Sequence, residues 1–101
     1  MVEQYSVKLY SRAYKDLDTI QKYISEELGE PLTALRTTDQ LENAIFSLST
    51  FPYRGSIRRI GCYAEEGYRQ LVVKNYLIIY SIDEAAKEVH IITIRYALSN
   101  F

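Results

Sequence analysis

The chain has 101 residues, 48% of them hydrophobic and 25% charged, and this length and composition predict one globular domain over residues 1–101. No apolar run approaches the roughly 20 residues of a transmembrane helix, and no secretory signal opens the sequence, so we expect a cytoplasmic protein without a membrane partner. A single cysteine and a single histidine exclude an internal disulfide and a Cys/His metal cluster, so neither a metal nor a cofactor is expected.

The charge is unevenly distributed, although the formal net charge is only −1. Residues 1–50 carry five basic and eight acidic side chains, whereas residues 51–101 carry seven basic and five acidic ones. The small net charge argues against nonspecific coating of nucleic acid. The basic second half is where we expect a phosphate or an acidic partner to bind.

The first elements predicted are a strand and a helix. Residues 3–10 alternate as in a half-buried strand, with one face made of Tyr5, Val7 and Leu9. Ser11 is expected to cap the following helix, and Gly29 is expected to end it. The apolar stripe of this helix recurs every three or four residues and consists of Ala13, Leu17, Ile20, Ile24 and Leu28.

A second helix is predicted to begin at Glu30-Pro31, because proline fits the first helical turn, and to end at Phe51-Pro52. Its apolar stripe consists of Ala34, Thr38, Leu41, Ile45 and Leu48. Because almost no loop separates the two helices, they should form an antiparallel hairpin.

The second half predicts strands. Residues 53–67 are typical of a surface loop, with a short strand within Ile57–Cys62. Residues 68–83 and 89–95 predict three antiparallel strands, the first two joined by a two-residue turn at Lys74-Asn75. The predicted order is β-α-α-β-β-β, an α+β fold in which the helical hairpin covers one face of an antiparallel sheet.

This order and four local motifs resemble the RelE/ParE superfamily of bacterial type II toxins. The motifs are Leu-Gly-Glu-Pro at 28–31, Phe51-Pro52 with Gly55, Tyr68-Arg-Gln-Leu-Val-Val-Lys-Asn-Tyr-Leu-Ile-Ile-Tyr80, and Ile94-Arg-Tyr-Ala97. The resemblance implies a growth-inhibiting toxin of a plasmid-stabilisation type, neutralised by a cognate antitoxin. A homodimer and a toxin–antitoxin hetero-oligomer are both compatible with it.

Two mechanisms occur in the superfamily: RelE-like members cut mRNA in the ribosomal decoding site, and ParE-like members inhibit DNA gyrase. If the chain is a nuclease, the resemblance implies Arg69 and Tyr96 as its catalytic residues. Leu77, however, stands where RelE-like members have an arginine, and Leu98-Ser99 replaces an arginine pair. The resemblance therefore favours a ParE-like, non-nucleolytic and weakened toxin, with a ribosome-dependent endoribonuclease or an inactive antitoxin-binding module as alternatives. Enzymatic activity stays open.

Several basic residues are candidates for binding a protein partner or nucleic acid, and they are Arg54, Arg58, Arg59, Lys74 and Arg95. A merely solvated loop explains the first three equally well, and Lys74 suits a turn. A cross-strand pair with Glu88 or Glu66 is an alternative role for Arg69. We interpret His90 as a packed or edge residue without a neighbouring carboxylate. Exposed tyrosines of the first helix, Tyr14 and Tyr23, are expected to contact a basic antitoxin segment.

Overall fold

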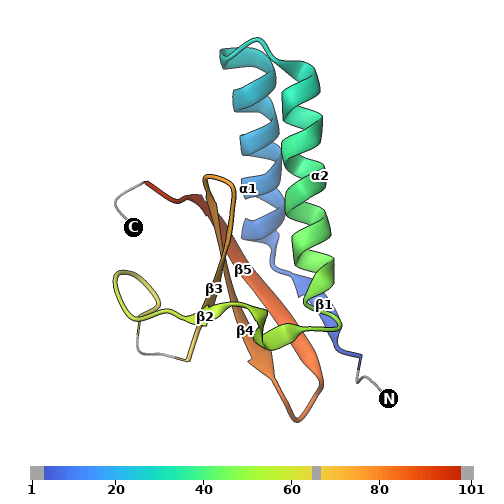
Figure 1. Ribbon diagram of the computed structural model, residues 1–101, viewed down its shortest axis with the longest axis vertical. Helices are drawn as coiled ribbons and strands as arrows, with labels where there is room; N and C mark the ends of the chain where they lie inside the picture. Colours follow the sequence, from blue (N-terminus) through green and yellow to red (C-terminus); the bar gives the residue numbers. More distant parts are fainter. Residues whose placement is uncertain (1–3, 65–66, 99–101) are drawn as a thin grey trace.

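The computed structural model describes residues 4–64 and 67–98, and within them two helices cover one face of a five-stranded sheet (Figure 1). In chain order the elements are β1 (Ser6–Leu9), α1 (Ser11–Lys22), a π-helical turn (Tyr23–Glu27), α2 (Pro31–Ser47), a 3₁₀ turn (Pro52–Arg54), β2 (Ser56–Ile57), β3 (Arg69–Val73), β4 (Tyr76–Asp83) and β5 (Glu88–Tyr96). The predicted α+β class and the helical hairpin are confirmed.

The sheet has the strand order β1-β5-β4-β3-β2. Neighbouring strands from β2 to β5 pair antiparallel, but β1 pairs with β5 in parallel, with Ser6 opposite Glu88. The predicted antiparallel sheet is thus confirmed for strands β2 to β5, and the parallel β1 edge was not predicted. Both helices lie between β1 and β5 in the chain, and such a long connection allows a parallel pair that local patterns cannot reveal.

Helix α1 begins without the predicted serine cap. Ser11 is its first residue, and Tyr10 precedes the helix with no side-chain cap. The backbone N–H of Tyr10 donates to the carbonyl of Ile91, while its own carbonyl accepts from Ala13 and Tyr14. Because the hydrogen bond to Ile91 of β5 holds Tyr10 in an extended conformation just after β1, it sets the start of the helix.

The first helix ends in a π-helical turn rather than in the regular α-helical turn that was predicted. Over Tyr23–Glu27 the chain forms a π-helical turn, in which Leu28 donates its N–H to the carbonyl of Tyr23. Gly29 then takes a φ of +67°, which suits glycine at a helix end. The wider turn rotates Leu28 out of the predicted buried stripe, and its side chain is 53% exposed.

The core lies between the helical hairpin and the sheet. Ala13 of α1 packs with Leu41 and Ile45 of α2 against Ile78 of β4 and Ile91 of β5, and all five are almost fully buried. The stripe predicted for α2 is buried at every position. Leu17 and Ile20 are only partly buried at the border of this core.

The turns and the short strand differ from the predictions in detail. Lys74 and Asn75 do connect β3 to β4, but the positive φ of 56° falls on Lys74 rather than on the asparagine. The short strand is Ser56–Ile57, N-terminal to most of the predicted Ile57–Cys62 segment. It pairs with the first two residues of β3, and the backbone N–H of Arg58 continues this pairing by donating to the carbonyl of Tyr68.

Candidate functional site

A buried tyrosine hydroxyl holds the arginine-rich loop after α2 against the sheet. The Tyr80 hydroxyl donates to the carbonyl of Pro52 at 2.8 Å and accepts the N–H of Gly55 at 2.9 Å. A Cβ on Gly55 would collide with the carbonyl oxygen of Gln70 and the Tyr80 hydroxyl, so only glycine fits here. Tyr80 of β4 thus holds in place the loop that carries three of the predicted binding arginines.

Arg69, a predicted catalytic residue, also helps to hold this loop against the sheet. Its guanidinium donates to the carbonyl of Gly55 at 2.5 Å and to that of Tyr53 at 3.3 Å, and it lies 5.2 Å from the centre of the Tyr53 ring. The alternative partner Glu88 instead accepts from His90, and Glu66 lies outside the described residues. The structure therefore places Arg69 where it ties the loop to β3.

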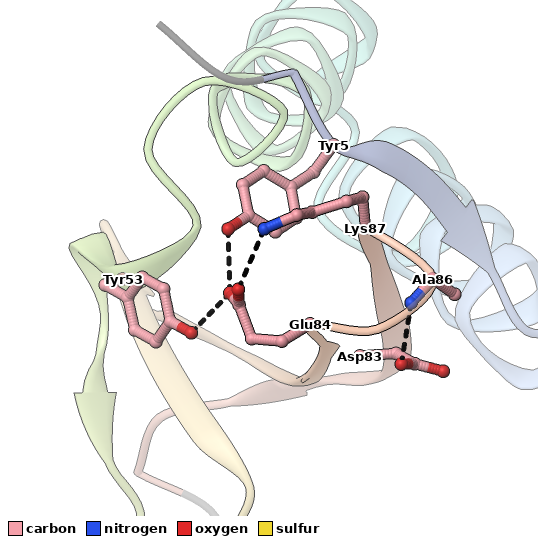
Figure 2. A network of polar contacts seen from close by, with 6 residues as sticks. All are labelled: Tyr5, Tyr53, Asp83, Glu84, Ala86 and Lys87. Atoms are coloured by element: carbon pink, nitrogen blue, oxygen red, sulfur yellow. Dashed lines mark hydrogen bonds and ion pairs between the residues drawn. The ribbon is translucent and has the colours of Figure 1, made fainter.

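Glu84, in the β4–β5 turn, links this loop to the start of the chain (Figure 2). One carboxylate oxygen accepts from the hydroxyls of Tyr53 at 2.5 Å and Tyr5 at 2.7 Å, and the other pairs with Lys87 at 3.1 Å. The hydrogen bond from Tyr53, then that from Tyr5, lowers the pKa of Glu84 to about 2. The same bonds raise the pKa of both tyrosines. This cluster is a structural junction between three segments.

The other loop arginines differ in their surroundings. Arg58 is only 7% exposed, because its side chain donates to the carbonyl of Cys62 and to the side-chain oxygen of Gln70. Arg54 donates to the hydroxyl of Ser47 at the end of α2. Arg59 is exposed. A fully solvated loop, one of the two interpretations of these arginines, is thus wrong for Arg58.

The sheet face opposite the helices carries an apolar row near the end of β5. Val72, Leu77 and Arg95 are direct cross-strand neighbours on β3, β4 and β5, so their side chains share that face. Val72 is 59% exposed, and Leu77 and Arg95 are partly exposed. The row borders a hollow of about 680 Å³ whose lining also includes Ile57, Ile60 and Arg59. One of the three positions in this row is cationic.

A larger groove of about 940 Å³ lies between the helical hairpin and the β3–β4 turn. Figure 1 shows that turn and the end of β5 beside α1, below the part of the hairpin that extends past the sheet. Its apolar lining comes mainly from Ile20, Ile24 and Leu28 of the helical side and from Ile94 of β5. Residues of the helical hairpin and of the sheet therefore both contribute to the apolar floor of the groove.

Aromatic and charged groups surround this floor. The rings of Tyr76 and Tyr96 meet edge to face with centroids 5.8 Å apart, and Tyr23 lines the groove from the helical side. Burial raises the pKa of the Tyr76 hydroxyl, and the nearby Tyr96 and Tyr23 act in the same direction. Lys74 and Arg95 line the sheet wall, while the helical wall carries both acidic and basic side chains, namely Asp16, Glu30 and Arg36.

The seven predicted site residues fall into three places. Lys74, Arg95 and Tyr96 line the groove together, Arg58 and Arg59 line the hollow on the opposite sheet face, and Arg54 and Arg69 hold the loop. Tyr96 also borders the hollow.

The two predicted catalytic residues do not share a site. Tyr96 lies in a row with Tyr76 and Val73, and Arg69 is four residues further along β3, which is roughly 13 Å.

Sequence reasoning missed Tyr76 and Arg36 as groove residues. Tyr76 could have been found only from the two-residue turn, which places its side chain beside the end of β5. His90, in contrast, has a carboxylate neighbour that was not expected: its ring nitrogen lies 2.9 Å from Glu88, and its ring lies 5.8 Å from that of Tyr10. Tyr14 is exposed and lies outside the groove, whereas Tyr23 lines it.

Within residues 4–64 and 67–98, no three His, Cys, Asp or Glu side chains lie close enough together to hold a metal ion. None of the helices in that part of the chain has the length and apolar character needed to cross a membrane.

Comparison with protein families matches residues 7–101 to the family described as the ParE toxin of the type II toxin–antitoxin system parDE. Among curated proteins, none matches in sequence.

Solved structures share the fold. A chain of the chromosomal ParDE toxin–antitoxin system from P. aeruginosa aligns with a TM-score of 0.74 and 22% identity, over 92% of this chain and 96% of that one. A chain of the RelBE2 toxin–antitoxin complex from Mycobacterium tuberculosis aligns with a TM-score of 0.65 and 21% identity, over 95% and 94%. The YoeB/ParE toxin from Agrobacterium tumefaciens aligns with a TM-score of 0.62 and 15% identity, over 90% and 96%.

Proposed function

Because the chain belongs to the ParE toxin family of type II toxin–antitoxin systems, we propose that it inhibits DNA gyrase without cutting nucleic acid. The observation that carries the proposal is the apolar row on the open sheet face. A metal-free ribonuclease needs a base, an acid and cations around the scissile phosphate. Val72 and Leu77 supply none of these groups, and Arg95 is the single cation of the row. The guanidinium of Arg69 donates to two backbone carbonyls on the other side of the sheet.

Inhibition of gyrase requires a binding surface rather than a reactive group. Arg59 is exposed beside Ile60, whose side chain is 84% exposed, in the loop that Tyr80 clamps to the sheet. A cationic and apolar patch on a fixed loop suits an acidic protein surface. This patch is our candidate for the contact with gyrase.

A supercoiling assay with purified gyrase tests the proposal. The wild-type chain should block supercoiling, and Arg59→Glu should weaken the block at least tenfold. Arg12→Glu is the matched control, because Arg12 is also an exposed arginine and lies on α1, far from the loop in sequence. Undisturbed supercoiling at a large excess of the wild-type chain would refute gyrase as the target. It would also leave the weakened or inactive binding module as the better description.

We further propose that a cognate antitoxin neutralises the chain by binding in the groove. The groove offers an apolar floor with Ile24 and Leu28, aromatic side chains at one end and charges of both signs on its walls. An amphipathic segment would bury its apolar stripe on this floor. The helical region from residue 15 to residue 42 carries seven acidic and three basic side chains, which favours a segment with basic flanks.

Two tyrosines of the first helix give a matched test of this binding site. Tyr23, in the π-helical turn after α1, lines the groove, whereas Tyr14 is exposed on α1 and lies outside the groove. Tyr23→Ala should weaken binding of the antitoxin encoded beside the toxin at least tenfold, as measured by calorimetry, whereas Tyr14→Ala should leave it unchanged. Equal effects of both substitutions, or none from Tyr23→Ala, would place the antitoxin elsewhere.

The alternative function is a ribosome-dependent mRNA endoribonuclease, and one observation favours it. Lys74, Arg95 and Tyr96 all line one groove, so two cationic residues and a tyrosine surround a single cavity. This alternative predicts that Arg95→Ala abolishes mRNA cutting, whereas the gyrase proposal predicts no cutting to abolish.

A further inference from the structure

Helix α2 carries a second apolar stripe on the side that faces away from the core. Its buried stripe includes Leu41 and Ile45, which are 1% exposed. On the opposite side of the helix, Leu32 is 67% exposed, Leu35 51% and Phe46 59%. A surface helix normally has one apolar face, so a second one indicates a contact with another chain. Figure 1 shows α2 along the outer edge of the helical hairpin.

Two of the three apolar residues in the exposed stripe are symmetric about Asp39, whereas Asn43 occupies the position that mirrors Leu35. Leu32 and Phe46 each lie seven residues from Asp39, which is two helical turns and roughly 10.5 Å on either side. The charged residues follow the same symmetry, because Arg36 lies three residues before Asp39 and Glu42 lies three residues after it. All of these side chains belong to exposed residues. A stripe of this kind is complementary to itself when a copy runs in the opposite direction.

We infer that the outer face of α2 binds a second copy of this chain across a two-fold axis near Asp39. In an antiparallel pair of helices at a shallow crossing angle, Leu32 of one copy lies opposite Phe46 of the other, and this contact occurs twice. Arg36 of each copy comes within reach of Glu42 of the second copy. The arginine-rich loop and the apolar floor of the groove lie on other parts of the surface, and of the contact residues named here only Arg36 also lines the groove, so the dimer goes beyond the proposed function.

Asp39 limits the strength of this dimer. The two-fold axis brings the two Asp39 carboxylates together, and like charges repel, although Arg36 lies one turn away on each helix. A single helix face also buries less than the roughly 800 Å² per partner of a standard interface. We therefore expect a dissociation constant of roughly 10–100 μM, in the range of transient interfaces.

Sedimentation equilibrium of the full chain over a wide concentration range tests the inference. The wild-type chain should associate to a dimer, and Phe46→Glu should abolish association. Phe51→Glu is the matched control, because Phe51 is 63% exposed but follows α2, and it should leave the dimer intact. Circular dichroism verifies that each variant keeps its fold.

Charge substitutions separate this geometry from other dimers. Asp39→Asn should tighten the dimer at least threefold, Arg36→Glu should abolish it, and the swap Arg36→Glu/Glu42→Arg should restore it. A chain that stays monomeric at every concentration overturns the inference. The inference is also overturned if Phe46→Glu leaves association unchanged, or if the charge swap does not restore it. A monomer whose Phe46→Glu variant loses antitoxin binding would assign the stripe to the antitoxin instead, which also overturns it.

Discussion

The hydroxyl of Tyr80 allows the clearest quantitative prediction, because its removal changes one atom in a fully buried place. Tyr80→Phe leaves the N–H of Gly55 and the carbonyl of Pro52 without their shared partner, and all three residues are buried. A buried polar group without a partner costs about 1–3 kcal/mol. The loop can relax in part, so we expect a loss of about 2–3 kcal/mol for the two groups together. At about 4 °C per kcal/mol, the melting temperature should fall by about 8–12 °C.

Urea unfolding followed by circular dichroism measures this loss. Tyr14→Phe serves as control, because the Tyr14 ring is 62% exposed and its hydroxyl should contribute less than about 0.5 kcal/mol. The same experiment should show an unchanged slope of free energy against urea, since the folded state stays compact. If Tyr80→Phe lies within 0.5 kcal/mol of wild type, then the hydroxyl does not hold the loop and the reasoning fails.

Three further predictions concern contacts that stabilise the fold. Gly55→Ala should lose about 1–3 kcal/mol of unfolding free energy in urea, because the new methyl group meets the carbonyl oxygen of Gln70; full stability would show that this contact is not tight. Glu84 has a folded pKa of about 2 against an ordinary 4.5, so its stabilising effect is complete above pH 4.5 and is lost as the pH falls towards 2. The free energy of unfolding in urea should therefore fall less steeply between pH 6 and pH 2.5 in Glu84→Gln than in the wild type. An identical decline would contradict the assignment. Asp16→Ala removes the acceptor for the backbone N–H of Ile94 and should cost about 1–2 kcal/mol by the same measurement, whereas no loss would mean that water replaces it.

The layers of the fold could be predicted because they follow from local patterns. The stripe of α2 is buried at all five predicted positions, and Lys74-Asn75 does form the turn before β4. The parallel β1–β5 pair could not be predicted, since it joins residues about eighty positions apart. The π-helical turn that exposes Leu28 has no signal in the spacing of apolar residues.

The candidate site was predictable only in part, because residue type does not reveal what a side chain contacts. Arg58 and Arg59 are neighbours in the sequence, yet the first is buried on loop acceptors and the second is exposed. The role of Arg69 depends on carbonyl groups fourteen and sixteen residues away, which are brought close by Tyr80. Leu77 was singled out by its departure from a family pattern, and the register then placed it beside Val72.

The central claim is that the apolar open face of the sheet leaves this toxin without ribonuclease chemistry. Incubating the purified chain with translating ribosomes and mapping the mRNA ends by primer extension tests it most directly. We predict an unchanged pattern of mRNA ends from a preparation that blocks gyrase supercoiling. New cleavage sites in the ribosomal decoding site that disappear in Arg95→Ala, together with unaffected supercoiling, would contradict the account.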